Sequence, residues 1–122
     1  MGYELVEPDA IQVSASAREL VGEQHGATVS LIIVDTPPGQ GPGLHRHPYE
    51  EVFVVHSGEA DFTVGDEVVR AGPGQVVIVH AGTPHGFRSV GPENARMVNI
   101  HASPRYVTEW LERAASRTRA PR

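Results

Sequence analysis

The stretch from residue 39 to residue 58 reads GQGPGLHRHPYEEVFVVHSG. Its glycine- and proline-rich first part predicts a loop that leads into two histidines, His45 and His47. Side chains alternate along an extended chain, so both imidazoles fall on one face, and Glu51 keeps the same parity. Two imidazoles and a carboxylate on one face form a donor set suited to a transition metal.

The composition around this stretch favours one small β domain. The 122 residues suffice for a single hydrophobic core, and we expect one domain over residues 1–122. The 13 glycines and 10 prolines suit short strands and tight turns better than helices. The chain has no cysteine, which excludes disulfides, thiolate metal ligands and cysteine nucleophiles.

The charge pattern excludes several classes of partner. A formal net charge of -5 argues against nucleic-acid binding, which requires a basic face. Every basic residue is an arginine, so lysine Schiff-base chemistry is excluded. The N-terminal residues lack the pattern of a signal peptide, and the apolar runs are far too short to span a membrane. We therefore expect a cytoplasmic protein with no nucleic-acid partner and no membrane partner.

Short apolar segments between turn residues predict an antiparallel β fold. Roughly eight strands, spaced about 8–12 residues apart, are typical of a sandwich or small barrel. Gly65 and Asp66 form a two-residue hairpin turn, and residues 19–26 are expected to be a polar connection. The expected strands are 11–17, 27–34, 52–55, 60–64, 67–70, 75–79, 85–90 and 95–101.

The C-terminal tail has a different period. Ser103 is a good N-cap, and Pro104 suits the first helical position. A single helical stripe would hold Tyr106, Val107, Trp110, Leu111 and Ala114. The pattern predicts an amphipathic helix over about residues 104–117, packed on the outside of the β domain.

Two spaced motifs resemble the cupin superfamily of jelly-roll barrels. In the first, Gly39 is followed after five residues by His45-x-His47, after three by Glu51 and after six by Gly58, and every position fits. The second motif is matched by Gly74, Gly82 and His85. It departs from the family at His80, where proline is usual, and at Ser89, where asparagine is usual. The resemblance implies an all-β cupin jelly-roll barrel over about residues 27–101.

The resemblance also implies a ligand set. His45, His47, Glu51 and His85 would coordinate one divalent transition metal, namely iron, nickel, manganese, zinc or copper, with no organic cofactor. In the simpler alternative the same residues form a hydrogen-bonded polar cluster without metal. Burying three imidazoles and a carboxylate is costly unless a cation or hydrogen bonds compensate, which favours metal binding.

Strand parity identifies candidate pocket residues around the metal. Phe53 shares the face of Glu51, and both Phe87 and Ser89 share the face of His85. An apolar lining would favour an aromatic or otherwise hydrophobic small molecule, although the two phenylalanines could equally be ordinary barrel core. Asn99 and His101 share one face of the last strand, and Tyr49 is expected at the rim.

The leading functional prediction is a metal-dependent enzyme that acts on a small aromatic or enolisable molecule. Similarity to cupin dioxygenases would make it a dioxygenase-type oxidoreductase, with Glu51 as the catalytic base toward a substrate hydroxyl. Similarity to cupin cyclases and isomerases would instead imply redox-silent Lewis-acid chemistry.

Two further functions are weaker. One is a noncatalytic metal or small-molecule binding module. The other is a sugar-phosphate isomerase, which needs inward basic groups, whereas Arg46 and Arg88 have the opposite parity to the neighbouring ligands. A homodimer is expected because edge strands need covering, and the segment before Ile11 is a candidate for exchange between subunits.

Overall fold

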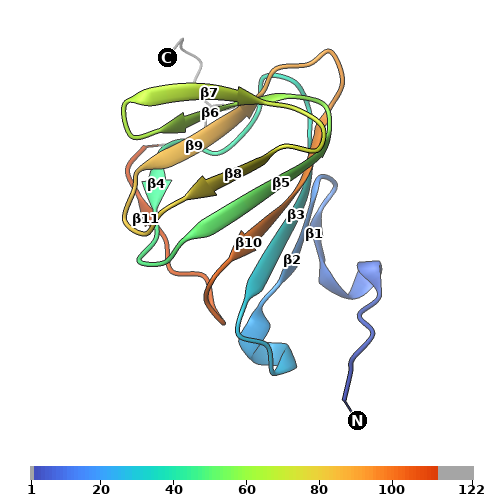
Figure 1. Ribbon diagram of the computed structural model, residues 1–122. Helices are drawn as coiled ribbons and strands as arrows, with labels where there is room; N and C mark the ends of the chain where they lie inside the picture. Colours follow the sequence, from blue (N-terminus) through green and yellow to red (C-terminus); the bar gives the residue numbers. More distant parts are fainter. Residues whose placement is uncertain (1, 113–122) are drawn as a thin grey trace.

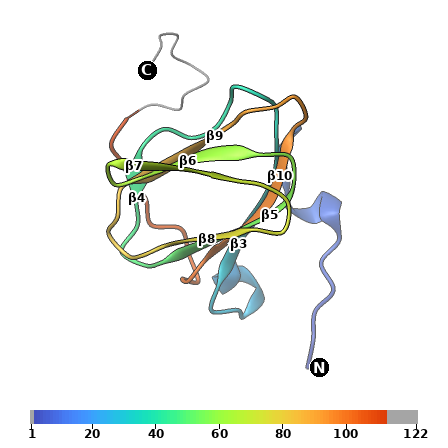
Figure 2. The ribbon, with the colours of Figure 1, turned by 45° about the horizontal axis from the view of Figure 1, so that its top comes forward.

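Two antiparallel β-sheets face each other and enclose the core (Figures 1 and 2). The computed structural model describes residues 2–112. The six-stranded sheet has the order β1-β2-β3-β10-β5-β8, and the five-stranded sheet has the order β11-β4-β9-β6-β7. The antiparallel all-β class predicted from the sequence is confirmed.

The described residues contain eleven strands and two short 3₁₀ helices. None of the helices among residues 2–112 has the length and apolar character needed to cross a membrane. The elements are η1 (Pro8–Ile11), β1 (Gln12–Ser14), β2 (Ala17–Leu20), η2 (Gly22–His25), β3 (Ser30–Thr36), β4 (His45–Arg46), β5 (Glu51–Ser57), β6 (Ala60–Val64), β7 (Glu67–Ala71), β8 (Val76–Val79), β9 (His85–Ser89), β10 (Ala95–His101) and β11 (Glu109–Trp110).

The N-terminal part differs from the prediction. The single strand expected over residues 11–17 is a hairpin instead, because Ala15 and Ser16 form a turn and Ser14 pairs with Ala17. The second strand of this hairpin, β2, runs into the segment expected to be a polar connection. The turn lacks glycine, asparagine and proline, and its serines give only a weak signal, here the hydrogen bond from the Ser16 amide to the Ser14 hydroxyl.

The predicted C-terminal helix is wrong over residues 104–112, and its remainder lies outside the described residues. The chain is extended here, and Glu109 and Trp110 pair with β4 as strand β11. The Tyr106 hydroxyl donates to the carbonyl oxygens of Leu20 (3.0 Å) and Leu31. A short isolated helix is marginally stable, so these hydrogen bonds and the open edge of β4 outweigh the helical pattern.

The core lies between the sheets and alternates along each strand. On β5, the side chains of Glu51, Phe53 and Val55 are buried, whereas Val52 and Val54 lie on the outer face. Phe53 packs edge-on against Phe62 of the opposite sheet, with ring centroids 5.1 Å apart. The polar residue Glu51 therefore lies on the inner face of β5, on the same side of the strand as the core residues Phe53 and Val55.

Two glycines allow the loop that leads into β4 to lie directly against β9. A Cβ atom on Gly41 would lie 2.0 Å from the carbonyl oxygen of Phe87, and one on Gly86 would lie 2.8 Å from that of Pro42. Gly41 also has a φ of 152°. This close approach brings the start of β4 beside the start of β9, where His45 pairs with His85.

Candidate metal centre

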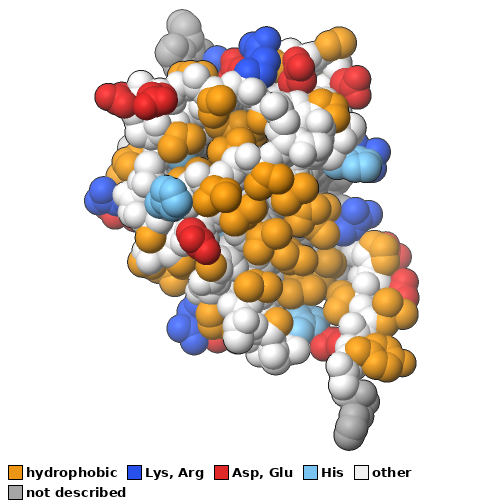
Figure 3. Space-filling model, in the orientation of Figure 1, with side chains coloured by type: hydrophobic (Ala, Val, Ile, Leu, Met, Phe, Trp, Pro, Cys, Tyr) orange, Lys and Arg blue, Asp and Glu red, His pale blue; other side chains and the backbone are white. Residues whose placement is uncertain are grey.

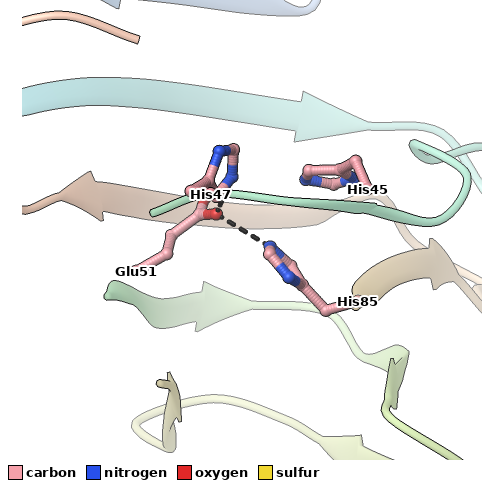
Figure 4. Close-up of side chains that lie close together, drawn as sticks. All are labelled: His45, His47, Glu51 and His85. Atoms are coloured by element: carbon pink, nitrogen blue, oxygen red, sulfur yellow. Dashed lines mark hydrogen bonds and ion pairs between the residues drawn. The ribbon is translucent and has the colours of Figure 1, made fainter. Parts of the chain in front are cut away.

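Four side chains from three parts of the chain converge inside the barrel. His45 lies on β4, His47 follows that strand, and Glu51 and His85 begin β5 and β9. One ligand atom from each lies within 4.8 Å of all the others. Figure 4 shows the three rings gathered around the Glu51 carboxylate. No side chain of the four is more than 6% exposed.

A backbone carbonyl fixes the tautomer of each of the three rings. Nδ1 of His45 donates to Gly43 (2.8 Å), Nδ1 of His47 to Val107 (2.9 Å) and Nδ1 of His85 to Thr83 (2.8 Å). With the proton on Nδ1, the lone pair of each ring is on Nε2. This hydrogen bond on the far nitrogen is the usual arrangement behind a metal-ligating histidine.

The inner nitrogens of two rings face the same carboxylate oxygen. Nε2 of His47 lies 2.9 Å from Oε1 of Glu51, and Nε2 of His85 lies 3.0 Å from the same oxygen. Each contact needs a hydrogen on Nε2, whereas Nδ1 of the same ring already donates to a carbonyl. A cation between the nitrogens and the carboxylate would satisfy every group, so the donor set fits a metal ion.

Burial and local contacts shift the pKa of two of the four residues, His45 and Glu51. Burial lowers the pKa of His45 to about 4, against a smaller opposing effect of its hydrogen bond to Gly43, so the ring is neutral at pH 7. Burial of Glu51 opposes its ionisation. Its contacts with His101, His47 and His85 outweigh that effect and hold its pKa well below the usual range.

A fourth imidazole contacts the other carboxylate oxygen. Nε2 of His101 lies 3.1 Å from Oε2 of Glu51, and Nδ1 of His101 lies 2.8 Å from the hydroxyl of Tyr49. That hydroxyl accepts a hydrogen bond from the Val107 amide (3.2 Å), which leaves its own hydrogen for Nδ1 of His101. With Nδ1 as the acceptor, a neutral His101 carries its proton on Nε2, and this nitrogen makes no hydrogen bond of normal geometry with residues 2–112.

A cavity of about 500 Å³ opens beside the cluster. Among the residues predicted for the pocket, Phe53, Phe87, Asn99 and His101 line it, and so do the ligand candidates His45, His47 and Glu51. Two predicted pocket residues lie elsewhere. Tyr49 reaches the site through His101, and Ser89 is fully buried with no partner for its hydroxyl among residues 2–112.

Sequence reasoning missed the part of the cavity wall formed by β2, β3 and the C-terminal segment. The missed lining residues include Glu19, Ile32, Tyr106, Thr108 and Trp110. Trp110 packs on His45, with ring centroids 4.7 Å apart. The β-branched pair Val107-Thr108 next to Trp110 was the one available sign of an extended segment.

The remaining histidines lie outside the cluster. His25 pairs with Glu4 near the N-terminus (2.8 Å), and both His56 and His80 are exposed. Arg46 and Arg88 point outward, as their parity predicts.

Several known proteins are similar to this chain. Over 63 residues it is 35% identical to dimethylsulfoniopropionate lyase DddQ of Ruegeria pomeroyi, covering 51% of this chain and 31% of that protein. Over 68 residues it is 38% identical to polyketide synthase CurC of Streptomyces cyaneus, covering 55% and 44%. The chain thus spans less than half the length of either relative.

Solved structures share the fold at lower identity. A conserved protein with a double-stranded β-helix domain from Klebsiella pneumoniae superposes with a TM-score of 0.72 at 21% identity, covering 91% of this chain and 99% of that one. Oxalate decarboxylase of Lactobacillus farciminis gives a TM-score of 0.71 at 22% identity, covering 82% and 32%. The model of the cupin domain matches residues 32–101, which span the whole cluster and more than half of the sequence. The chain therefore belongs to the cupin family.

Proposed function

We propose that this cupin is a metal-dependent enzyme that acts on a small organic molecule at a mononuclear centre of His45, His47, His85 and Glu51. The observation that carries the proposal is the common anchoring of the three rings, each with Nδ1 on a backbone carbonyl. Nε2 of His47 and of His85 faces the Glu51 carboxylate, and His45 completes the group of four ligand atoms within 4.8 Å of one another. The cavity beside them gives a small molecule access to the same point.

The bound metal would act as a Lewis acid on an oxygen of the substrate. Around it, the chain supplies groups that hold and move a proton. Glu51 is ionised at neutral pH and can accept a proton at Oε2, the oxygen next to Nε2 of His101. Tyr49 contacts Nδ1 of His101 on the side away from Glu51 and so holds the ring beside that carboxylate.

The chemistry proposed first is non-oxidative, a lyase, cyclase or isomerase reaction. It is supported by the two relatives described above, which are a lyase and a polyketide synthase. The second candidate is the dioxygenase-type reaction predicted from the sequence, which the donor set of three histidines and one glutamate supports equally well.

An oxygen-dependence experiment separates these candidates. The metal content is first measured in protein purified without added metal. Flavonol, catechol and diketone substrates are then followed by mass spectrometry in air and under argon, with oxygen uptake recorded in parallel. Product formed under argon supports non-oxidative chemistry, whereas oxygen consumed in proportion to product supports a dioxygenase.

A third outcome would contradict the enzyme proposal. If the protein retains one metal and binds compounds of the panel but converts none in either atmosphere, it is a binding module. Glu51→Gln serves as the matched variant, since it keeps the shape of the side chain and removes its charge. Conversion that persists unchanged in Glu51→Gln would exclude the proposed proton-accepting role.

A further inference from the structure

The described walls of the cavity carry acidic side chains but no arginine or lysine. Among the described residues 2–112, those that line it include two carboxylates, Glu19 and Glu51, and no arginine. The sequence contains no lysine. A substrate with a negative charge at each end could bind the metal with one end. The described lining offers no arginine or lysine side chain to its other end.

Asn99 is a buried polar residue without a partner. It lies on the inner face of β10, is 4% exposed and lines the cavity. Its Oδ1 atom is buried, and its amide makes no hydrogen bond within residues 2–112. An unpaired buried amide is unfavourable, which points to a hydrogen bond made with a ligand.

Glu19 lies in the same row of the six-stranded sheet. Across the inner face, Glu19 of β2 pairs with Ile32 of β3, which pairs with Asn99 of β10. Glu19 is half-buried, and its carboxylate forms no hydrogen bond or ion pair with any of residues 2–112. Its charge lies near Tyr106, whose pKa is raised first by burial and then by Glu19.

This row lies beside the row that holds the metal cluster. His101, two residues along β10 from Asn99, pairs with Glu51 of β5. At ~4.8 Å between strands, β2 lies ~14 Å from β5, and Asn99 is on a strand between them. The cavity therefore offers the metal cluster at one end and unpaired acceptors, Asn99 Oδ1 and Glu19, toward the other.

We infer that the cavity takes a small molecule that binds the metal through oxygen and carries a cationic amine-type group, received by Asn99 and Glu19. This inference rests on the proposed function, because the oxygen end of the ligand needs the metal. It names the substrate class of the same site and excludes short dianionic acids. Glu19 sets the preference for a cationic group, and Asn99 supplies a hydrogen-bond acceptor between Glu19 and the metal.

The test uses three acids of equal chain length that differ at the far end. The probes are 6-aminohexanoate, heptanoate and heptanedioate, titrated calorimetrically into the zinc-loaded protein. We expect 6-aminohexanoate to bind about tenfold or more tighter than heptanoate, since hydrogen bonds to charged groups are the strong ones, and heptanedioate to bind weakest. Glu19→Gln should abolish this order, whereas Glu67→Gln on the exposed strand β7 should preserve it.

Asn99→Leu distinguishes a ligand-binding amide from a structural one. Because the amide has no partner in the free protein, the variant should unfold at the same temperature or higher, while its affinity for 6-aminohexanoate falls. A large loss of stability would show that Asn99 is a structural core residue.

Other results would overturn the substrate class. Equal binding of the three acids, tighter binding of heptanedioate, or no binding to protein that retains zinc would each contradict it. Failure of the metal site itself is distinguished in the same samples, because the protein would then fail to retain zinc.

Discussion

His45, His47 and His85 owe their arrangement to contacts on the outer side of each ring. The carbonyl acceptors come from Gly43, Thr83 and Val107. The first two lie two residues before their histidine, so the local turn itself sets the ring orientation. The Val107 carbonyl comes from a segment far along the chain, and no sequence pattern near His47 predicts this contact.

Removing one ligand should abolish metal retention. We expect His85→Ala to weaken metal binding by more than about a hundredfold, since loss of an outer hydrogen-bond partner alone costs about 10–100-fold. His56→Ala is the control, because His56 is exposed on β5 and lies outside the cluster. Metal content by mass spectrometry after dialysis measures both. Equal retention in the two variants would remove His85 from the ligand set.

The metal-free protein should lose stability as the solution is acidified. The folded pKa of His45, about 4, lies below the ordinary histidine value of 6.5, so between these values the unfolded chain binds the proton and the folded one does not. The free energy of unfolding therefore rises with pH through this window and falls on acidification. A shift of this size corresponds to roughly 3 kcal/mol.

Urea unfolding of the metal-free protein at pH 7.0 and 4.5 measures this effect. Its matched control is His45→Gln, which should lose much less stability between the two pH values. A wild-type stability that is flat over this range would contradict the buried, neutral state of His45.

Parity along the strands was the most reliable guide at the residue scale. It placed Phe53 and Phe87 on inner faces and both Arg46 and Arg88 on outer ones, as observed. It gave Asn99 and His101 one common face of β10 without deciding which, and the structure places that face inside. The alternation of side chains predicts on which face of a strand a residue lies, but it does not predict which residue it contacts. The contact of His101 with Glu51 depends on the pairing of β10 with β5, which is set by the whole fold.

At the scale of elements, the segment from residue 102 to residue 110 closes the site. It delivers the carbonyl of Val107 to His47, the ring of Tyr106 to His101 and the indole of Trp110 to His45. A helix over the same residues would use the Val107 carbonyl internally. The helical period was present in the sequence, but tertiary hydrogen bonds decided the structure.

The attachment of this segment depends on the Tyr106 hydroxyl. Tyr106→Phe leaves the carbonyl oxygens of Leu20 and Leu31 without this donor, so the free energy of unfolding should fall by about 1–3 kcal/mol. Urea denaturation is the measurement. Glu109→Gln removes an exposed ion pair with Arg46 and should change stability by less than about 1 kcal/mol. Equal effects of the two substitutions would contradict this role of Tyr106.

At the scale of the whole molecule, the outer face of the six-stranded sheet is apolar. Figure 3 shows hydrophobic side chains gathered over these strands. They form two rows in register across four strands, Leu31-Ile100-Val52-Ile78 and Ile33-Val98-Val54-Val76. Ile78 is 55% and Val76 51% exposed. Such a contiguous patch is typical of a protein interface.

We predict that this face pairs with a second copy of the chain. Near the patch the N-terminal segment leaves the body (Figure 1), with Tyr3 86% and Leu5 78% exposed, and it can extend the contact. Ile78→Lys should convert the dimer to a monomer in sedimentation velocity. Val68→Lys, on the opposite sheet and 66% exposed, should leave the mass unchanged. A wild-type monomer at high protein concentration would contradict the prediction.

X-ray absorption spectroscopy of the metal-loaded protein measures the ligand set of the proposed metal centre. We expect one metal per chain with an inner shell of three imidazole nitrogens and one carboxylate oxygen from Glu51, plus solvent. An inner shell of oxygen atoms alone, or one with fewer than three imidazole nitrogens, would contradict the proposed metal centre.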